Sequence, residues 1–506
     1  MEPDAASVSQ LKVSDGRPSH APTGDTDMTY SLKDLNGSPT SVSDEDLSAL
    51  RAEMRGSVLL PDDEGYEAAR TVWNGMIDRH PGLVVQPLGT SDVKAAVEFA
   101  ARHALLISIQ GGGHQIGGLA VADGALLLDM SRMRHAHVDP DARTVRVGAG
   151  CLLGDVDREC QRHGLAFPTG INSTTGIAGL TLGGGFGWIT RKHGMTVDNL
   201  LSAEIVTADG SILTISPDSH PDLFWACTGG GGNFGVVTSF KFRLHPVGPE
   251  ILSGLLVHPL DAGPELLRKF REISTSAPDE LTVWTVMRKA PPLPFIPEDW
   301  HGREVLIFAV CYCGDMAEGE EAVAELRALG RPIADVIGPH SYIGWQAAFD
   351  PLLTPGMRNY WKSQDFLDLT EETIGHLLDA ARDLPDDQSE IVLPHLGGAM
   401  ARVAPDATAF PQRASHFTMN LHTRWEDPGK DEACIAWARA LSDKVAAQSA
   451  GSVYVNFMPE DDAGRIDSAY GANMDRLRAV KARYDPGNLF RVNHNIRPEA
   501  DARAAE

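Results

Sequence analysis

Three clusters of glycine constrain this chain more than any other feature of its sequence. They occupy residues 110–118 (QGGGHQIGG), 176–187 (GIAGLTLGGGFG) and 229–235 (GGGGNFG). Each cluster adjoins apolar, strand-like residues, which argues against three floppy surface loops. Because glycine has no Cβ, the backbone N–H groups of such turns can approach a pyrophosphate closely and hold it. The clusters therefore favour the binding of a dinucleotide.

The common nucleotide-binding motifs do not account for these glycines. Gly230, Gly232 and Gly235 formally match GxGxxG, but a strand-like run follows them where that motif requires a helix. No acidic residue after a second strand completes the motif, and the P-loop pattern is absent. We therefore reject a Rossmann site.

The balance of charge excludes several classes of partner. Lys and Arg number 44 and Asp and Glu 69, which gives a net charge of −25, and no basic run is present. A surface this negative repels phosphate backbones and anionic lipid, so neither nucleic acid nor a membrane is an expected partner. No apolar stretch approaches the roughly 20 residues that span a bilayer, and the N-terminus lacks the features of a secretory signal.

The six cysteines form neither a CxxC pair nor a disulfide-like pattern. Cys311 and Cys313, for instance, lie one residue apart in an apolar run that reads as a strand. This usage indicates reduced core cysteines in a cytoplasmic protein, and we expect no metal site.

The 506 residues suffice for two domains or one large composite. Residues 1–45 are rich in Ser, Asp, Thr, Pro and Gly, and they predict a disordered tail. A helix is expected over 91–103, followed by a strand over 105–109 that runs into the first glycine cluster. Beyond residue 250, strands alternate with helices but are separated by hairpins, which is typical of an α+β architecture.

The order of the motifs along the chain resembles that of one family. Pro168-Thr169-Gly170 and Asp198-Asn199 stand between the glycine clusters, and YDPGNLF and NHNI follow within residues 484–496. This ordered set resembles the berberine bridge enzyme-like FAD-linked oxidases, within the vanillyl-alcohol oxidase and p-cresol methylhydroxylase superfamily. The resemblance runs from about residue 59 to residue 498.

The resemblance implies an α+β, two-domain, PCMH-type fold that binds FAD. The FAD-binding domain would comprise residues 50–248, with residues 450–500 returning to it. A substrate domain of antiparallel sheet covered by helices would occupy residues 249–449, and the isoalloxazine ring would lie between the two.

The resemblance also assigns the residues that bind FAD. They are Gly111, Gly112, Gly113, His114, Gln115, Gly170, Asn172, Thr175, Gly176, Gly179, Gly183, Gly184, Gly185, Gly187, Val206, Asn493 and Asn495.

His114 would be bonded covalently to the flavin 8α carbon, although a lone histidine beside glycines is by itself more typical of a solvated loop. Many relatives add a second bond from a cysteine four residues before the glycine that corresponds to Gly176. Asn172 stands there, and a carboxamide cannot form a thioether, so we expect a single attachment.

The candidate catalytic residues are Tyr454, Asn420 and His422. Alternation along the strand expected over 416–422 places Asn420 and His422 on one face. Relatives carry Gln or Glu at the position of Asn420, which cannot act as a base but can orient a substrate.

Phe457 replaces the second tyrosine of the family's Tyr-x-Asn-Tyr, often the catalytic one. Tyr454 or His422 would then accept the proton, or the substrate could be a neutral amine that needs no strong base. The sequence is equally consistent with a structural role for Tyr454, as a packed residue of a strand. Tyr360 and Trp361 are expected to line the substrate pocket, and Lys362 to be solvated or ion-paired.

We therefore expect an FAD-dependent oxidase that oxidises an alcohol or amine of a small molecule, in secondary metabolism. Hydride would pass to the flavin, and O2 would reoxidise it. Two other readings stay open: a flavin-bearing antibiotic-binding or resistance protein, and a carbohydrate oxidase. Sugar-oxidising relatives generally keep the attachment cysteine that this chain lacks. Another electron acceptor in place of O2 also stays open.

Overall fold

A four-stranded sheet presents the first glycine cluster. In the computed structural model, which describes residues 29–499, it has the order β3 (Ser57–Leu59), β4 (Leu83–Gln86), β6 (Leu126–Asp129) and β5 (Ile107–Gln110). β4, β5 and β6 run parallel and are mostly apolar, as expected for strands buried on both faces. The first glycine cluster begins where β5 ends.

A five-stranded antiparallel sheet lies beside it. Its order is β11 (Ile212–Ile215), β10 (Leu200–Val206), β12 (Val236–Arg243), β8 (Thr144–Gly148) and β7 (Ala136–Asp139). The hairpin predicted at Asp209-Gly210 is confirmed, because β10 and β11 pair on either side of it.

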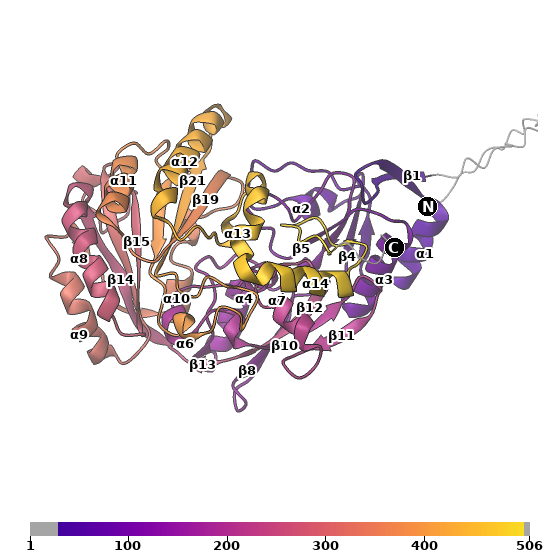
Figure 1. Ribbon diagram of the computed structural model, residues 1–506, viewed down its shortest axis with the longest axis horizontal. Helices are drawn as coiled ribbons and strands as arrows, with labels where there is room; N and C mark the ends of the chain where they lie inside the picture. Colours follow the sequence, from indigo (N-terminus) through magenta and orange to yellow (C-terminus); the bar gives the residue numbers. More distant parts are fainter. Residues whose placement is uncertain (1–28, 500–506) are drawn as a thin grey trace, which may run out of the picture.

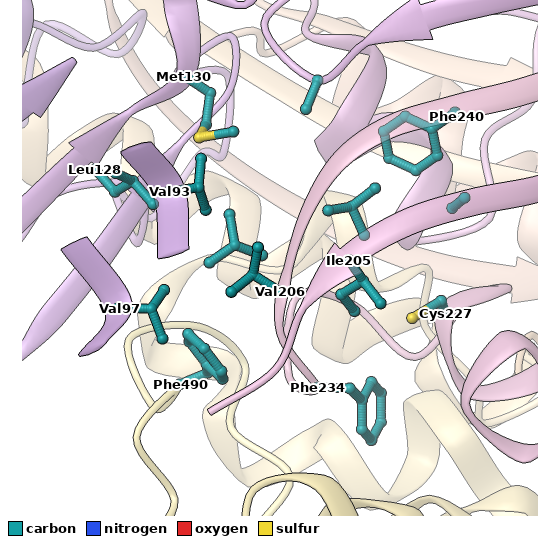
Figure 2. Packing of buried hydrophobic residues seen from close by; sticks show 14 of the residues in the cluster. Val93, Val97, Leu128, Met130, Ile205, Val206, Cys227, Phe234, Phe240 and Phe490 are labelled. Carbon is teal, nitrogen blue, oxygen red and sulfur yellow. The ribbon is translucent and has the colours of Figure 1, made fainter. Parts of the chain in front are cut away.

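Helix α3 (Thr90–Arg102) fills the space between these two sheets and confirms the helix predicted over 91–103. Figure 2 shows its Val93 and Val97 close to Leu128 of β6 and Val206 of β10. Burial of such residues supplies about 25 cal/mol per Å² of apolar surface.

The third large sheet is antiparallel throughout and is built from residues 250–425. Its strands are, in order, β17 (Ala334–Asp335), β14 (Glu250–Pro259), β16 (Glu304–Tyr312), β15 (Leu281–Lys289), β20 (Glu390–Pro394), β21 (Phe417–Trp425) and β19 (Arg358–Phe366), with β18 (Gly338–Ser341) also on β14.

Four helices cover one face of this sheet: α8 (Gly263–Ser276), α9 (Met316–Arg327), α11 (Glu371–Ala381) and α12 (Asp431–Val445). Figure 1 shows them on its outer side. On the opposite face, sheet residues such as Trp284 and Ile307 pack against Phe186 of the second glycine cluster and Trp188, which follows it. The sheet thus covers the glycine-rich part of the molecule.

The C-terminal segment returns to the first two sheets. Helix α14 (Met474–Tyr484) contacts α7 (Pro221–Cys227), and its fully buried Lys481 donates hydrogen bonds to the carbonyl oxygens of Asn233 (2.7 Å) and Phe490 (2.9 Å). Lys481 also pairs with buried Asp485 at 2.7 Å. This ion pair therefore fixes the third glycine cluster, which contains Asn233.

The prediction of disorder over residues 1–45 is wrong where the structure describes it. Strands β1 (Thr29–Lys33) and β2 (Pro39–Ser43) form a hairpin, and α1 (Asp44–Glu53) follows with Ser43 as its N-cap. Leu32 and Val42 are almost fully buried, and these few apolar residues suffice because they pack on the existing core. Residues 1–28 lie outside the described residues.

No helix within residues 29–499 is long and apolar enough to cross a membrane. All six cysteines are buried and free.

Lys481→Met should lower the free energy of unfolding by about 3–5 kcal/mol, because it leaves the Asp485 carboxylate buried without its counter-charge. Chemical denaturation followed by tryptophan fluorescence measures the change. Arg478→Ala, on the same helix as Lys481, removes an exposed pair with Asp467; it serves as the control and should cost less than about 1 kcal/mol. Equal losses in the two variants would contradict the assignment.

Candidate active site

A cavity of about 350 Å³ lies where the three glycine clusters meet the face of the large sheet. Sixteen of the residues predicted from the sequence line it: Gly111, Gly112, Gly113, His114, Gln115, Gly170, Asn172, Thr175, Gly176, Gly179, Gly183, Trp361, Asn420, His422, Tyr454 and Asn493. One wall is therefore glycine-rich backbone, and the opposite wall carries side chains of β19, β20 and β21.

Glycine is required at several points of this wall. A Cβ on Gly112 would lie 2.3 Å from the backbone nitrogen of Gly176, so the first two clusters touch backbone to backbone. Gly179 and Gly232 behave differently, since a Cβ on either would meet no protein atom within 4 Å. Both residues line the cavity, so side chains there would take up space that a ligand can use.

The first cluster also offers hydrogen-bond donors. None of the backbone N–H groups of residues 112–115 donates to another residue of the described chain, although all four residues line the cavity. Successive unpaired N–H groups form an anion-binding concavity suited to a pyrophosphate. The buried Oδ1 of Asn493, which has no partner among the described residues, is a further polar group at the cavity. This wall fits a dinucleotide.

His114 is held in one orientation at the cavity. Its ring stacks on Trp73 with centroids 4.9 Å apart, and its Nε2 lies 2.9 Å from the Thr174 hydroxyl. Burial lowers the pKa of His114 to about 3, so the ring is neutral near pH 7. A neutral imidazole keeps one nitrogen lone pair and can act as a nucleophile.

Five residues assigned to FAD binding do not line the cavity: Gly184, Gly185, Gly187, Val206 and Asn495. A Cβ on Gly187 would lie 1.8 Å from the carbonyl oxygen of Thr169, so this glycine serves packing. Val206 is buried in the core between the sheets. Gly187 therefore serves packing and Val206 the core, and the sequence motif does not distinguish such positions from those that line the cavity.

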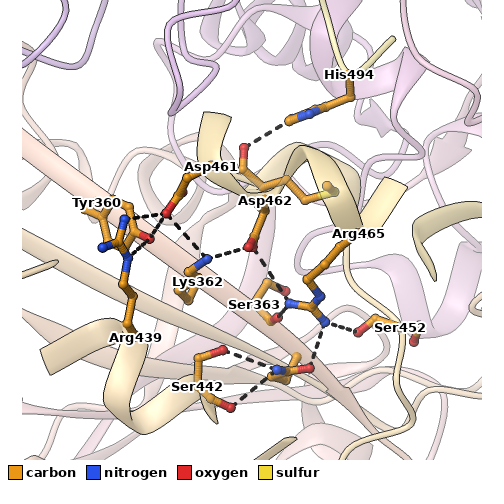
Figure 3. Close-up of polar contacts among 12 residues, drawn as sticks. Tyr360, Lys362, Ser363, Arg439, Ser442, Ser452, Asp461, Asp462, Arg465 and His494 are labelled. Carbon is orange, nitrogen blue, oxygen red and sulfur yellow. Dashed lines mark hydrogen bonds and ion pairs between the residues drawn. The ribbon is translucent and has the colours of Figure 1, made fainter. Parts of the chain in front are cut away.

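The assignment of Tyr360 to the substrate pocket is also corrected. Because strand residues alternate between faces, Trp361 lines the cavity, whereas the Tyr360 hydroxyl donates to Asp461 at 2.7 Å. Lys362 shares the face of Tyr360 and pairs with Asp462, which confirms the ion-paired reading of this lysine. Figure 3 shows this network, which ties the C-terminal segment to β19.

A row of three charged or polar side chains crosses the sheet beside the cavity. In the strand register, Arg288 of β15 lies opposite Glu390 of β20, and Glu390 lies opposite His422 of β21. Arg288 donates to Glu390 at 2.7 Å, and His422 Nδ1 lies 3.1 Å from the other carboxylate oxygen. Because an ionised carboxylate can only accept, His422 Nδ1 carries the proton.

The other nitrogen of His422 is then a lone-pair acceptor. Nε2 is buried and has no partner among the described residues, and His422 lines the cavity. Burial lowers the pKa of His422, with Glu390 acting in the opposite direction. Burial would raise the pKa of Glu390, but Arg288 and His422 outweigh it and hold that pKa below its usual value. The site can therefore accept a proton at Nε2.

Tyr454 is less suited to that role. Its hydroxyl oxygen accepts hydrogen bonds from the Gly185 N–H (3.0 Å) and from Asn456 Nδ2 (2.9 Å), and burial raises its pKa to about 12. The phenol therefore stays neutral and can donate its own hydrogen. Asn420 lines the same cavity, and its buried Oδ1 has no partner within residues 29–499.

Sequence reasoning missed Trp73, Trp284, Phe186 and Glu390, which also line the cavity. Phe186 lies within the second glycine cluster, whose pattern marks only the glycines, and the other three residues belong to no motif. Only Glu390 carried a signal, as a lone acidic residue at the start of an apolar run, and that signal is weak.

Comparison with known proteins places this site in a family. Residues 81–216 match the FAD binding domain model, and residues 453–497 match the model described as berberine and berberine like. An uncharacterized FAD-linked oxidoreductase of Bacillus subtilis is 31% identical over 88% of this chain and 98% of its own length. The (R)-6-hydroxynicotine oxidase of Paenarthrobacter nicotinovorans is 31% identical over 88% and 97%.

Solved structures agree. The chain is similar to 6-hydroxy-D-nicotine oxidase from Arthrobacter nicotinovorans, with a TM-score of 0.79 and 28% identity over 88% of this chain and 98% of that one. Berberine bridge enzyme from Eschscholzia californica shares the fold, with a TM-score of 0.80 and 20% identity over 90% and 99%. The chain therefore belongs to the berberine bridge enzyme-like FAD-linked oxidoreductases and has their PCMH-type α+β fold.

Proposed function

We propose that this enzyme oxidises an alcohol or an amine of a small molecule in secondary metabolism and returns the electrons to O2. The observation that carries the proposal is His422, whose buried Nε2 has no partner in the described part of the chain while Glu390 holds its Nδ1–H. We assign residues 50–248 and 450–500 to FAD binding and residues 249–449 to the substrate.

FAD bound along the glycine wall supplies a two-electron acceptor for hydride from the substrate carbon. His422 Nε2 accepts the proton that the substrate hydroxyl or ammonium group gives up. The resulting imidazolium is stabilised by Glu390, which lies on its Nδ1–H. Asn420 Oδ1 accepts a hydrogen bond from the same substrate group and orients it.

The rest of the cavity favours an apolar substrate body. Trp284, Phe186, Phe457 and Trp361 line it, and such side chains exclude water and contact aromatic or aliphatic groups. Sugars need many hydrogen-bond partners, which this wall offers sparingly. The relative whose name specifies an oxidase of 6-hydroxynicotine is compatible with this substrate class.

A substrate screen tests the proposal. Aryl-alkyl amines, aryl alcohols, 6-hydroxynicotine and xylobiose are mixed with the protein without O2, and loss of the oxidised flavin spectrum is followed. An amine or alcohol should bleach the flavin, and air should restore it with release of H2O2. Bleaching by xylobiose alone would make the protein a carbohydrate oxidase. Reduced flavin that persists for minutes in air would require another acceptor, and tight binding without bleaching would indicate a binding protein.

His422→Asn should lower kcat/KM about 10²–10⁴-fold, the usual contribution of a general base. FAD content should stay unchanged, because the substitution lies on the substrate wall. His416→Gln, at the edge of the same strand and outside the cavity lining, is the matched control. A full rate in His422→Asn would exclude this base.

The fall of kcat/KM at low pH should report the protonation of His422. Its folded pKa is lowered, so activity should persist below pH 6.5 and fall only as the ring becomes protonated. Glu390→Gln removes a negative charge that raises this pKa, so the acid limb should move to still lower pH. An acid limb that moves to higher pH, or does not move, would contradict the pairing of Glu390 with His422.

We propose further that His114 holds the flavin by a single covalent bond. Acid-denatured wild-type protein should then stay yellow, and His114→Ala should release its FAD on denaturation. Each Cys→Ser variant should keep the flavin, since all six cysteines are buried away from the cavity lining. A mass spectrum with FAD on a cysteine peptide would overturn the assignment.

A further inference from the structure

A directed chain of hydrogen bonds begins at His114 and ends at a backbone carbonyl. Asn172 Oδ1 accepts from the Thr174 N–H at 2.9 Å and from the Thr174 hydroxyl at 2.6 Å. Asn172 Nδ2 donates to the Leu353 carbonyl at 3.3 Å. Exchanging the oxygen and nitrogen of this amide would set Nδ2 against the Thr174 N–H and Oδ1 against the Leu353 oxygen, so the orientation is fixed.

The direction of these hydrogen bonds determines the tautomer of His114. The Thr174 hydroxyl has one hydrogen, and Asn172 Oδ1, which has none, receives it. At 2.9 Å from His114 Nε2, the Thr174 oxygen can therefore only accept. Nε2 carries the proton, and the lone pair of the neutral ring lies on Nδ1. No partner among the described residues occupies Nδ1.

A second contact fixes the plane of the ring. Trp73 stacks on His114, and its Nε1 donates at 3.2 Å to the same Leu353 carbonyl that Asn172 uses. The contacts thus close a ring through Thr174, Asn172, Leu353 and Trp73. Rotation of His114 would break either the stack or the bond to Thr174.

We propose that Thr174 and Asn172 are positioning residues for flavin attachment: they hold His114 with Nε2 protonated and present Nδ1 to the flavin 8α carbon. This inference rests on the proposed covalent bond and adds which nitrogen reacts and what selects it. Asn172 stands at the position where many relatives carry a second attachment cysteine. In this protein the Asn172 amide forms no bond to the flavin and acts by orienting Thr174, which in turn holds His114.

The attachment step balances with O2 as the oxidant. One C–N bond forms between Nδ1 and the 8α methyl carbon, and one C–H bond of that methyl group breaks. The methyl hydrogen and the Nε2 hydrogen leave as protons, and two electrons reduce the flavin. O2 then takes up the two electrons and two protons as H2O2, which leaves oxidised, attached flavin.

Attachment is measured without any substrate. Full-length protein from flavin-depleted cells is mixed with FAD in air, samples are quenched in acid, and the flavin retained on the chain is measured over time. Thr174→Val should bind FAD but attach it roughly 10–100-fold more slowly, the size of loss seen when the hydrogen-bond partner of a metal-ligating histidine is removed. Thr174→Ser should restore the rate. Asn172→Leu should also slow attachment, because it removes the acceptor of the Thr174 hydroxyl hydrogen.

Ser173→Ala is the matched control. It removes a neighbouring hydroxyl that bonds to Asp350 and does not touch His114, and it should attach FAD at the wild-type rate. NMR of the flavin peptide from wild-type protein should place the bond on Nδ1. A bond on Nε2, or a wild-type rate in Thr174→Val, would overturn the positioning role of Thr174 and Asn172. The proposal of a covalent bond to His114 would still stand. Wild-type protein that releases all its FAD would overturn both, while the substrate screen would stand independently.

Discussion

The backbone contact between the first two glycine clusters is the constraint on which the site depends. Gly112 and Gly176 lie so close that no side chain fits between them. This contact brings His114, two residues after Gly112, beside Thr174, two residues before Gly176. In the same segment the N–H groups of residues 112–115 donate to no other described residue. One steric requirement thus sets His114 beside Thr174, next to the segment whose free N–H groups suit an anion.

The substrate wall depends on strand register in the large antiparallel sheet. Arg288, Glu390 and His422 come from three neighbouring strands and meet because their positions are directly opposite. Taken singly, each would be a costly buried polar group, but together Arg288 neutralises Glu390 and Glu390 fixes His422. A slip of one residue in β20 would turn Glu390 to the helix-covered face and remove the partner of His422.

The sequence predicted the glycine wall far better than the substrate wall, for a physical reason. Residues of the first two clusters act within short, ordered motifs, so their positions on the chain imply their place in the cavity. Glu390 and Trp73 act through long-range pairing, and nothing local marks them. The same motifs misled at Gly187, where the glycine packs under Thr169 and does not face the cavity.

The two walls are mechanically connected through the turn that contains Leu353. Arg424, two residues beyond His422 on β21, donates hydrogen bonds to the carbonyl oxygens of Leu352 and Thr354 on either side of Leu353. The Leu353 carbonyl in turn accepts from Asn172 and Trp73, which orient His114. Because β21 carries His422 and also fixes this turn, the strand that provides the proposed base also determines how the proposed attachment histidine faces the flavin.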